Sequence, residues 1–453
     1  MMNQTHTRMQ KMRQLLLILL PILVTQVTMF AMTFFDTFMS GHAGSTDLAG
    51  VAIGASIWVP VQTGLTGILF AVTPMVAQLV GERRQDRVAF TVIQGVYVAV
   101  IVAAAVAAAG FFALDPILDR MSLESSVREI ARGFLTAISA GILPLFVYTV
   151  LRCFMDGLGQ TRMSMMITLV SLPVNAGLNY LLIFGSLGFP RLGGVGAGVA
   201  SAITYWVICL IAALFIARYR PFAEYRVFGR LYGLSLRAFG ELLRIGVPIG
   251  FAIFFETSIF AAVTLLMSEF QTVTIAAHQA ALNFASFLYM IPLSISMALT
   301  ILVGFEAGAR READARQYSY LGIGSALGMA VLCAVVLLLF RGPIAAIYTS
   351  EPEVLELVEH FLLYALFFQL SDALAAPIQG ALRGYKDVNV TLVVALVSYW
   401  VIGLPVGYWL AHTELGAFGY WIGLITGLAF GAAGLFTRLV YVQRSRAREQ
   451  AAS

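Results

Sequence analysis

The residues of this sequence that could do chemistry inside a membrane are a few carboxylates set in long apolar stretches. Glu256 lies near the middle of residues 242–267, a run of 26 residues in which Arg244 is the only other charge. A helix rises about 1.5 Å per residue, so this run can cross a hydrocarbon core of roughly 30 Å and place Glu256 near its midplane. A carboxylate there costs about 2.5–3.5 kcal/mol, which favours a function over chance retention. The alternative is a structural, protonated Glu256 that is hydrogen-bonded within a helix bundle.

Composition identifies the class of protein that holds this carboxylate. Of 453 residues, 60% are hydrophobic and only 11% are charged. A soluble domain of this length does not need that much apolar surface. Lys and Arg outnumber Asp and Glu by 28 to 24, but the basic residues lie in short loops between apolar runs, as they do in membrane proteins. We therefore expect a polytopic membrane protein with no nucleic-acid partner.

Twelve apolar segments are long enough to span a membrane as helices, and none shows the alternating pattern of a barrel strand. The predicted fold class is therefore all-α with twelve transmembrane helices. The first segment is too long for a signal peptide and lacks a small-residue cleavage site. The predicted spans are residues 14–40, 49–80, 88–114, 128–154, 163–184, 194–217, 241–268, 274–308, 316–340, 354–382, 388–411 and 417–442.

The charges on the loops predict how the chain is oriented. With an even number of spans both ends lie on one side, and that side carries 23 of the 28 Lys and Arg residues. By the positive-inside rule, both termini are expected in the cytoplasm. The five basic residues on the other side are Arg120, Arg128, Arg132, Arg191 and Arg341.

The sequence repeats itself at a constant offset, which places Pro21 on Pro248 and Gly157 on Gly384. Six predicted helices lie in each copy, so the copies have the same topology and form a parallel repeat about a pseudo-two-fold axis along the membrane normal. Two similar six-helix lobes are typical of transporters. The predicted parts are an N-terminal lobe at residues 1–217, a cytoplasmic connector at 218–240 and a C-terminal lobe at 241–453.

Polar residues converge on one level of the N-terminal lobe. Asp36 lies in the outer half of the first predicted helix, and Asn175 and Asn179 share one face of the fifth. Ala197 and Ser201 lie a few turns from the outer end of the sixth. A carboxylate with amide oxygens and a hydroxyl could hold a small hard cation or a proton. Interhelical hydrogen bonding alone would explain the asparagines, but not Asp36.

A second set of polar residues lies in the C-terminal lobe. Glu256 and Asp372 both fall near mid-depth, with Tyr289 close to the same level. Gln279 and Asn283 lie one to three turns further out and are candidate supporting residues. Two carboxylates and an aromatic ring could attract a cation through charge and through cation–π contact. For Tyr289 alone, simple packing is the better interpretation.

Other features argue against catalysis. The acids Asp156, Glu269 and Glu306 lie near helix ends and are expected to be structural, and the three cysteines are isolated within apolar segments. The five histidines lie at or beyond predicted helix ends, without a paired metal-binding motif. No phosphate-binding GxxxxGK[ST] loop or nucleophile motif is present, so we expect no enzyme and no cofactor. The energy for transport must then come from an ion gradient or from the substrate.

Several segments of the sequence, in a fixed order and spacing, carry a resemblance to a known family: FFDTFMSGHAGSTDLAGVAIG, GLGQTR with its counterpart ALRGYKD, PRLGGVGAGVASAITYW, FFETSIF and FQLSDALAAPIQGALRG. Through them the chain resembles the multidrug and toxic compound extrusion (MATE) family, NorM branch, over essentially all twelve predicted helices. The resemblance implies two six-helix lobes that export cationic or amphipathic drugs across the bacterial cytoplasmic membrane by alternating access, in exchange for Na⁺ or H⁺.

The resemblance also implies roles for the two polar sets. Na⁺ is a candidate ligand at Asp36 or at Glu256 with Asp372, and the sequence does not decide between Na⁺ and H⁺. We expect a monomer whose partners are drugs and membrane lipid. The family's site positions fall on Asp36, Asn175, Asn179 and Ser201, where threonine is common in the family, and on Glu256, Tyr289 and Asp372.

The alternative function is a flippase for lipid-linked precursors in the same superfamily. Such a cargo carries anionic pyrophosphate, which calls for Arg or Lys in the cavity. The predicted spans place no Lys or Arg near mid-depth, whereas the deep charges are negative. The pattern therefore favours a cationic cargo.

Overall fold

The computed structural model describes residues 2–452, and this part of the chain is helical with no strand. It contains twelve helices long and apolar enough to cross a membrane, in agreement with the twelve predicted segments. The protein is therefore a multi-pass membrane protein. The α-helices are α1 (Arg8–Ala43), α2 (Ser45–Leu69), α3 (Val72–Gly81), α4 (Val88–Arg120), α5 (Ser125–Gly157), α6 (Thr161–Phe184), α7 (Gly194–Arg218), α8 (Leu236–Leu266), α9 (Thr272–Gly308), α10 (Glu312–Tyr348), α11 (Pro352–Gly384), α12 (Asn389–Ala395), α13 (Leu404–Ala411) and α14 (Phe418–Ala452).

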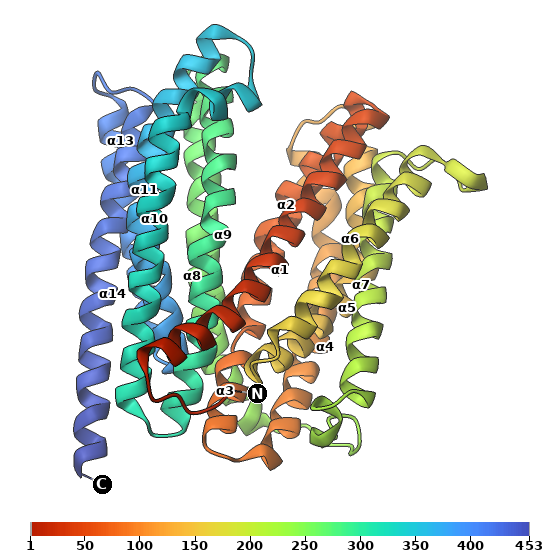
Figure 1. The fold of residues 1–453 in the computed structure, drawn as a ribbon. Helices are drawn as coiled ribbons and strands as arrows, with labels where there is room; N and C mark the ends of the chain where they lie inside the picture. Colours follow the sequence, from red (N-terminus) through yellow and green to blue (C-terminus); the bar gives the residue numbers. More distant parts are fainter. Residues whose placement is uncertain (1, 453) are drawn as a thin grey trace. The chain divides into compact units, whose positions relative to one another are not determined.

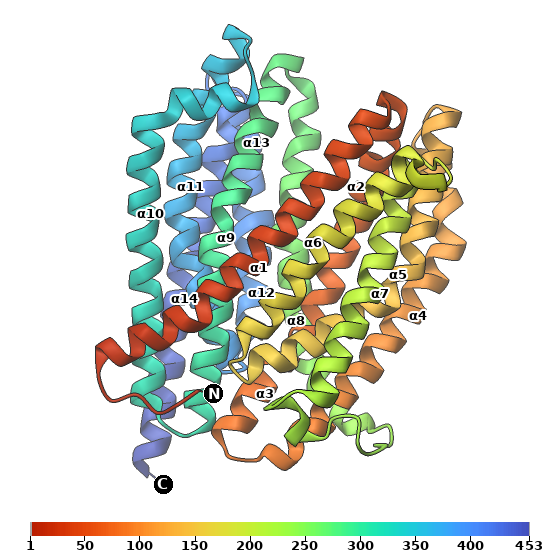
Figure 2. The same ribbon diagram turned by 45° about the vertical axis from the view of Figure 1, so that its right-hand side comes forward.

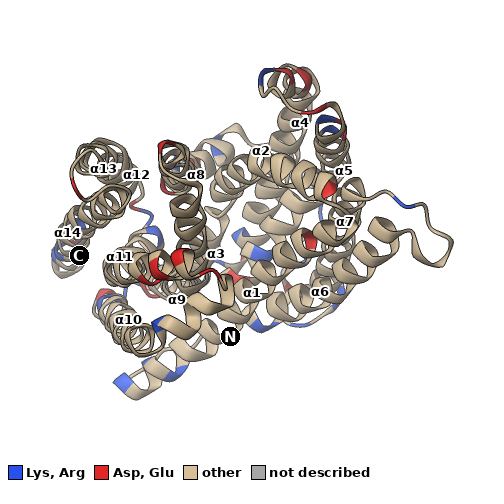
Figure 3. Cartoon of the chain, turned by 90° about the horizontal axis from the view of Figure 1, so that it is seen from above, with Lys and Arg blue, Asp and Glu red and all other residues tan. Residues whose placement is uncertain are grey.

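Two spans consist of more than one helical element. The second span, Ser45–Gly81, joins α2 and α3. The eleventh, Asn389–Ala411, runs through α12, the π-helical segment η5 (Leu396–Gly403) and α13. Charged residues are few, and the helices are uncharged over most of their length (Figure 3). That distribution is expected where lipid surrounds the outer faces, because a charge there would lose its hydration.

Contacts between helices divide the chain into two units. The first unit contains Val24–Gly250, and the second contains Met2–Leu23 together with the chain from Phe251 onward. The beginning of α1 therefore packs with the second unit, and the beginning of α8 with the first. The two division points, after Leu23 and after Gly250, are separated by the offset of the internal repeat, so the exchange of helix starts follows that repeat.

One central helix organises each unit. In the first unit α5 packs against α7, α2 and α4, and in the second α11 packs against α9, α10 and α14 (Figures 1 and 2). Over their most apolar stretch α5 and α11 are 61% and 67% buried, whereas the peripheral α4 is 17% buried. Lipid-facing side chains of α4, such as Phe111 and Phe112, are exposed and apolar. Both central helices can therefore hold polar side chains away from lipid.

The internal repeat is visible in the packing of equivalent glycines. A Cβ at Gly157 would meet Val76 Cβ at 2.8 Å, and one at Gly384 would meet Val303 Cβ at 2.9 Å. The two pairs are related by the offset that also relates Pro21 to Pro248. Each glycine lets two helices approach more closely than any side chain would permit. The repeat that the sequence predicted therefore extends to the contacts inside each unit.

The segment that links the two copies is anchored on the first unit. Phe222 is fully buried, with its ring centroid 5.9 Å from that of Phe154. Gln94 Nε2 donates to the carbonyl oxygen of Gly233 at 2.8 Å, and Tyr97 donates to that of Tyr232 at 2.6 Å. The predicted connector is therefore tied down by packing and by hydrogen bonds to its backbone.

Candidate cation-binding sites

In the first unit, a hydrogen-bonded cluster surrounds Asp36 of α1. Asn179 of α6 donates from Nδ2 to Asp36 Oδ1 at 2.6 Å, and Ser201 of α7 donates to Asp36 Oδ2 at 3.3 Å. Asn179 Nδ2 also contacts Asn175 Oδ1 at 3.1 Å, because the two residues are one helical turn apart. The structure thus brings together four of the predicted residues from three helices.

The cluster is rich in oxygen atoms and is well buried. Asn175 and Asn179 are fully buried, Ser201 is 4% exposed, and Ala197 fills the turn before Ser201 without exposed surface. In the described part of the chain, Asn179 Oδ1 is buried without a hydrogen-bond partner. A buried amide oxygen beside a carboxylate is a suitable ligand for a hard cation. The donor set fits Na⁺, and the carboxylate alone could accept a proton.

Sequence reasoning missed one neighbour of this cluster. Tyr205 of α7 is close enough to interact electrostatically with Asp36. It follows Ser201 by four residues, so both side chains lie on one face of α7. That spacing was a signal available in the sequence. Tyr205 therefore places a phenol within electrostatic range of Asp36.

In the second unit, a larger cluster forms around Glu256 of α8. Gln379 of α11 donates from Nε2 to Glu256 Oε1 at 2.6 Å. Asp372, earlier on α11, is 6% exposed and interacts electrostatically with Glu256. Tyr289 of α9 lies within electrostatic range of both carboxylates. Glu256, Asp372 and Tyr289, which were predicted separately, therefore share one site.

Three further residues of this site were not predicted. Gln379 and Arg383 of α11 are each 8% exposed, and Arg383 is close enough to interact with the charge of Glu256. Tyr399, in η5, is 5% exposed and lies within electrostatic range of Glu256 and Asp372. The sequence placed Arg383 at a helix end, although its side chain is buried. The repeat offered a signal for Gln379, since it pairs this residue with Arg152, a charged residue inside the predicted span 128–154.

A π-helical segment, η5, carries Tyr399. Wider helical turns rotate the side chains that follow, and such segments are common at functional positions. Pro405, two residues after the end of η5, lacks the N–H group that a regular α-helical ladder would use. The indole of the neighbouring Trp400 donates to the carbonyl oxygen of Phe255 at 3.2 Å, which ties η5 to α8 beside Glu256.

The two predicted supporting residues lie elsewhere in the second unit. Gln279 is exposed and donates to Thr264 Oγ1 at 3.2 Å. Asn283 is exposed and accepts a hydrogen bond from Tyr348 at 3.0 Å. Their hydrogen bonds therefore join them to a threonine and a tyrosine, not to the two carboxylates. His278, which precedes Gln279 on the same helix, is 1% exposed and accepts a hydrogen bond from Trp421 at 3.0 Å.

Other buried charges are paired within the protein. Arg152 and Asp156, one turn apart on α5, are 3.5 Å apart and both buried, and Ser164 donates to Asp156 at 2.6 Å. Glu306 is fully buried and contacts Arg311 at 2.5 Å. These partners match the structural role expected of Asp156 and Glu306. Among the described residues, no group of three or more His, Cys, Asp or Glu side chains could hold a metal ion.

Two repeated bundles of membrane-spanning helices, with carboxylates held in apolar surroundings, define the class as a membrane transporter. Comparison with known proteins identifies the family. The MatE family model matches residues 21–181 and 248–409, more than half of the chain. The two matches begin at Pro21 and Pro248, which the internal repeat pairs. The chain belongs to the MatE family, and it is a transporter, not an enzyme.

Relatives and solved structures agree with this assignment. A protein of Bacillus licheniformis called "Probable multidrug resistance protein NorM" is 62% identical over 98% of both chains. A Bacillus subtilis protein of the same name is 61% identical over 99% of this chain and all of its own. The crystal structure of the eukaryotic MATE transporter AtDTX14 superposes with a TM-score of 0.88 at 22% identity, over 98% of each chain. The Vibrio cholerae MATE transporter VcmN, in a mutant form, gives 0.87 at 20% identity over 96% of this chain and 98% of its own.

Proposed function

We propose that this transporter exports cationic or amphipathic drugs across the cytoplasmic membrane in exchange for Na⁺ or H⁺. Close relatives bear the name of multidrug resistance proteins. The observation that carries the proposal is the carboxylate cluster of each unit, in which Asp36 and Glu256 are held by neutral amides instead of by a direct ion pair. We further propose that both termini are cytoplasmic and that a single chain is sufficient.

The second-unit cluster has the charge needed to attract a monovalent cation. Glu256 and Asp372 together carry two negative charges when ionised, and Arg383 supplies one positive charge nearby. One negative charge therefore remains for a cationic drug or a coupling ion. Tyr289 and Tyr399 lie within electrostatic range of the same acids, so a cation bound there could make cation–π contact with their rings.

Coupling between drug and ion follows from this charge. A proton or Na⁺ on a carboxylate cancels the negative charge that a cationic drug would use. The interaction is reciprocal, because a drug that binds a carboxylate must weaken ion binding by the same factor. Competition of this kind lets an ion gradient drive drug release. A flippase of lipid-linked precursors would instead need unbalanced cations, and the charge of Arg383 is outweighed by two acids.

The proposal is tested by measuring how ions change drug affinity in the absence of a gradient. We expect added Na⁺ or lower pH to weaken the binding of a fluorescent cationic dye to the purified protein at least tenfold. Glu256→Gln and Asp36→Asn should each reduce that response. Asp86→Asn, which removes an exposed acid of the first unit, is the matched control.

A second measurement identifies the coupling ion. The wild-type protein is placed in proteoliposomes, and either a Na⁺ gradient or a pH gradient is imposed while dye export is followed. The gradient that drives dye export identifies the coupling ion. Dye affinity that ignores both Na⁺ and pH in the wild type would contradict the proposal.

A further inference from the structure

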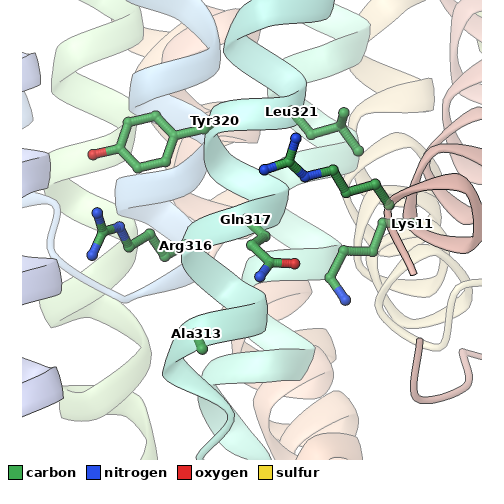
Figure 4. Close-up of a pocket in the computed structure, with 7 residues that line it drawn as sticks. Lys11, Ala313, Arg316, Gln317, Tyr320 and Leu321 are labelled. Atoms are coloured by element: carbon green, nitrogen blue, oxygen red, sulfur yellow. The ribbon is translucent and has the colours of Figure 1, made fainter. Parts of the chain in front are cut away.

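A hollow of about 560 Å³ lies in the second unit, between the beginning of α1 and the first turns of α10. Its volume falls in the range of small-molecule sites, roughly 300–1,000 Å³. Figure 4 shows Arg316 and Tyr320 on one flank of α10, with Lys11 approaching the other flank. This site is separate from the carboxylate clusters. Its lining residues are Arg8, Lys11, Ala313, Arg316, Gln317, Tyr320 and Leu321.

A network of polar contacts holds the wall of this hollow in place. Lys11 is 2% exposed, and its Nζ lies 2.8 Å from Asp314 Oδ1. The same ammonium donates to the carbonyl oxygen of Thr5 at 3.0 Å, and the Thr5 hydroxyl lies 3.0 Å from the Tyr318 hydroxyl. The beginning of α1 is thereby attached to α10. The hollow is preorganised, so a ligand would not have to order it.

The charges around the hollow leave two arginines unbalanced. Asp314 is paired with Lys11 and lies 3.8 Å from Arg311, and Arg311 also contacts Glu306. Within the described part of the chain, neither Arg8 nor Arg316 takes part in an ion pair, and both are exposed. The guanidinium carbon of Arg316 lies 5.8 Å from the centroid of the Tyr320 ring. The hollow therefore presents two cations to an anionic ligand.

The hollow lies where two membrane spans begin. The first span starts at Arg8 and the ninth at Glu312. Further along α1, Leu16 and Leu20 are 41% and 54% exposed, as expected for lipid-facing side chains. On α10, Arg316, Tyr320, Gly324 and Gly328 follow one another at intervals of four residues, so they lie on one face of the helix.

These two glycines lie on the exposed face of α10, next to the basic hollow. A Cβ at Gly324 or at Gly328 would meet no atom within 4 Å, so the space beside this face is open. An acyl chain could lie along this face of the span, whereas a soluble anion would use only the hollow.

We propose that this hollow binds the headgroup of an anionic phospholipid, with its phosphodiester between Arg8 and Arg316 and an acyl chain along Gly324 and Gly328. Arginine forms charge-assisted hydrogen bonds with phosphate, and basic pockets at the ends of membrane spans suit such headgroups. Gln317 adds an amide to the same surface. The bound lipid would join the beginning of α1 to α10 and so reinforce the Lys11–Asp314 contact.

Competition between two lipids in native mass spectrometry tests the proposal. The purified full-length protein is incubated with phosphatidylglycerol and phosphatidylcholine of identical acyl chains, and the tightest-bound lipid is identified. We expect the wild type to prefer phosphatidylglycerol. The Arg8→Gln/Arg316→Gln variant should lose about thirtyfold of that preference, since each nearby cation contributes about one kcal/mol and each tenfold corresponds to about 1.4 kcal/mol.

Three controls establish whether the preference belongs to this hollow. Arg87→Gln/Arg162→Gln removes the same charge from exposed positions of the first unit and should retain the preference. Arg8→Lys/Arg316→Lys keeps the charge and should retain most of it. Inorganic phosphate and glycerol 3-phosphate should not displace the lipid. An unchanged preference in the double glutamine variant, an equal loss in the first-unit control, or displacement by either soluble phosphate would overturn the proposal.

Discussion

The two units place buried charges differently on the same repeated backbone. Three positions are equivalent in the two units: they hold Met29, Arg152 and Asp156 in the first unit, and Glu256, Gln379 and Arg383 in the second. Each set contains one acid, one arginine and one uncharged residue, in a different order. In both units the second residue contacts the first: Arg152 Nη1 lies 3.5 Å from Met29 Sδ, and Gln379 Nε2 lies 2.6 Å from Glu256 Oε1.

The order of the three residues decides whether the acid forms a direct ion pair or stays open, that is, without an arginine in direct contact. In the first unit the acid and the arginine are one turn apart on α5, so their charges offset each other within one helix. In the second unit the acid is on α8, its partner is a neutral amide, and Asp372 adds another acid nearby. The same backbone therefore carries a closed ion pair in one unit and an open carboxylate site in the other.

The open carboxylate of the first unit lies at another level of its helix. Asp36 follows Met29 by two helical turns, or about 10 Å along α1. The residue of the second unit that is equivalent to Asp36 is Val263, which is 1% exposed. Side-chain placement, and not backbone geometry, thus separates the two candidate sites.

The largest effect is expected from removing the open carboxylates. Asp36→Asn and Glu256→Gln keep hydrogen-bonding capacity but cannot balance a cation or exchange a proton. We expect each to reduce the export of a cationic dye from vesicles at least tenfold, at equal protein amount and with unchanged unfolding temperature. Asp86→Asn should export normally. Export at the wild-type rate by either site variant would contradict an assigned role for that carboxylate.

A smaller effect, on stability instead of transport, is expected at the closed pair. Asp156→Asn leaves Arg152 buried without its counter-charge, which should lower the free energy of unfolding by about 3–5 kcal/mol. The apolar double variant Arg152→Met/Asp156→Leu should recover most of that loss and retain export. Denaturant unfolding and dye export measure the two outcomes. A stable double variant without export would show that the pair has a functional role after all.

The smallest effect is expected at the equivalent glycines Gly157 and Gly384, and it tests whether their similar packing contributes equally to stability in the two units. Gly157→Ala and Gly384→Ala each add a methyl group against the equivalent Val76 and Val303. Each should lower the free energy of unfolding by about 1–3 kcal/mol, and by similar amounts. Gly110→Ala, on an open part of α4, should be neutral or slightly stabilising. If only one of the two glycine variants lowered the free energy of unfolding, the repeat would hold for the backbone but not for this packing.

Much of the fold could be predicted from the sequence because the hydropathy of a short stretch is enough to identify a membrane span. Each predicted span corresponds to a helical span, although the helices extend further, as α14 does to Ala452. That extension of α14, QRSRAREQAA, is polar, so hydropathy does not detect it. The predicted site residues Asp36, Asn179 and Ser201 meet because their positions along three different spans correspond in depth. Depth alone also suggested Gln279 and Asn283, whose side chains bond elsewhere in the second unit.

The sequence by itself determined the class of protein, the twelve spans, the internal repeat and the carboxylates at membrane depth, because apolar length and internal offset are properties of a linear chain. Only the tertiary structure decided which polar side chains share a site. Gln379 contacts Glu256 because α11 turns that face toward α8, and Arg383 on the same helix and Tyr399 in η5 lie within electrostatic range of that acid. Helix rotation depends on contacts between distant segments, so no local pattern specifies it.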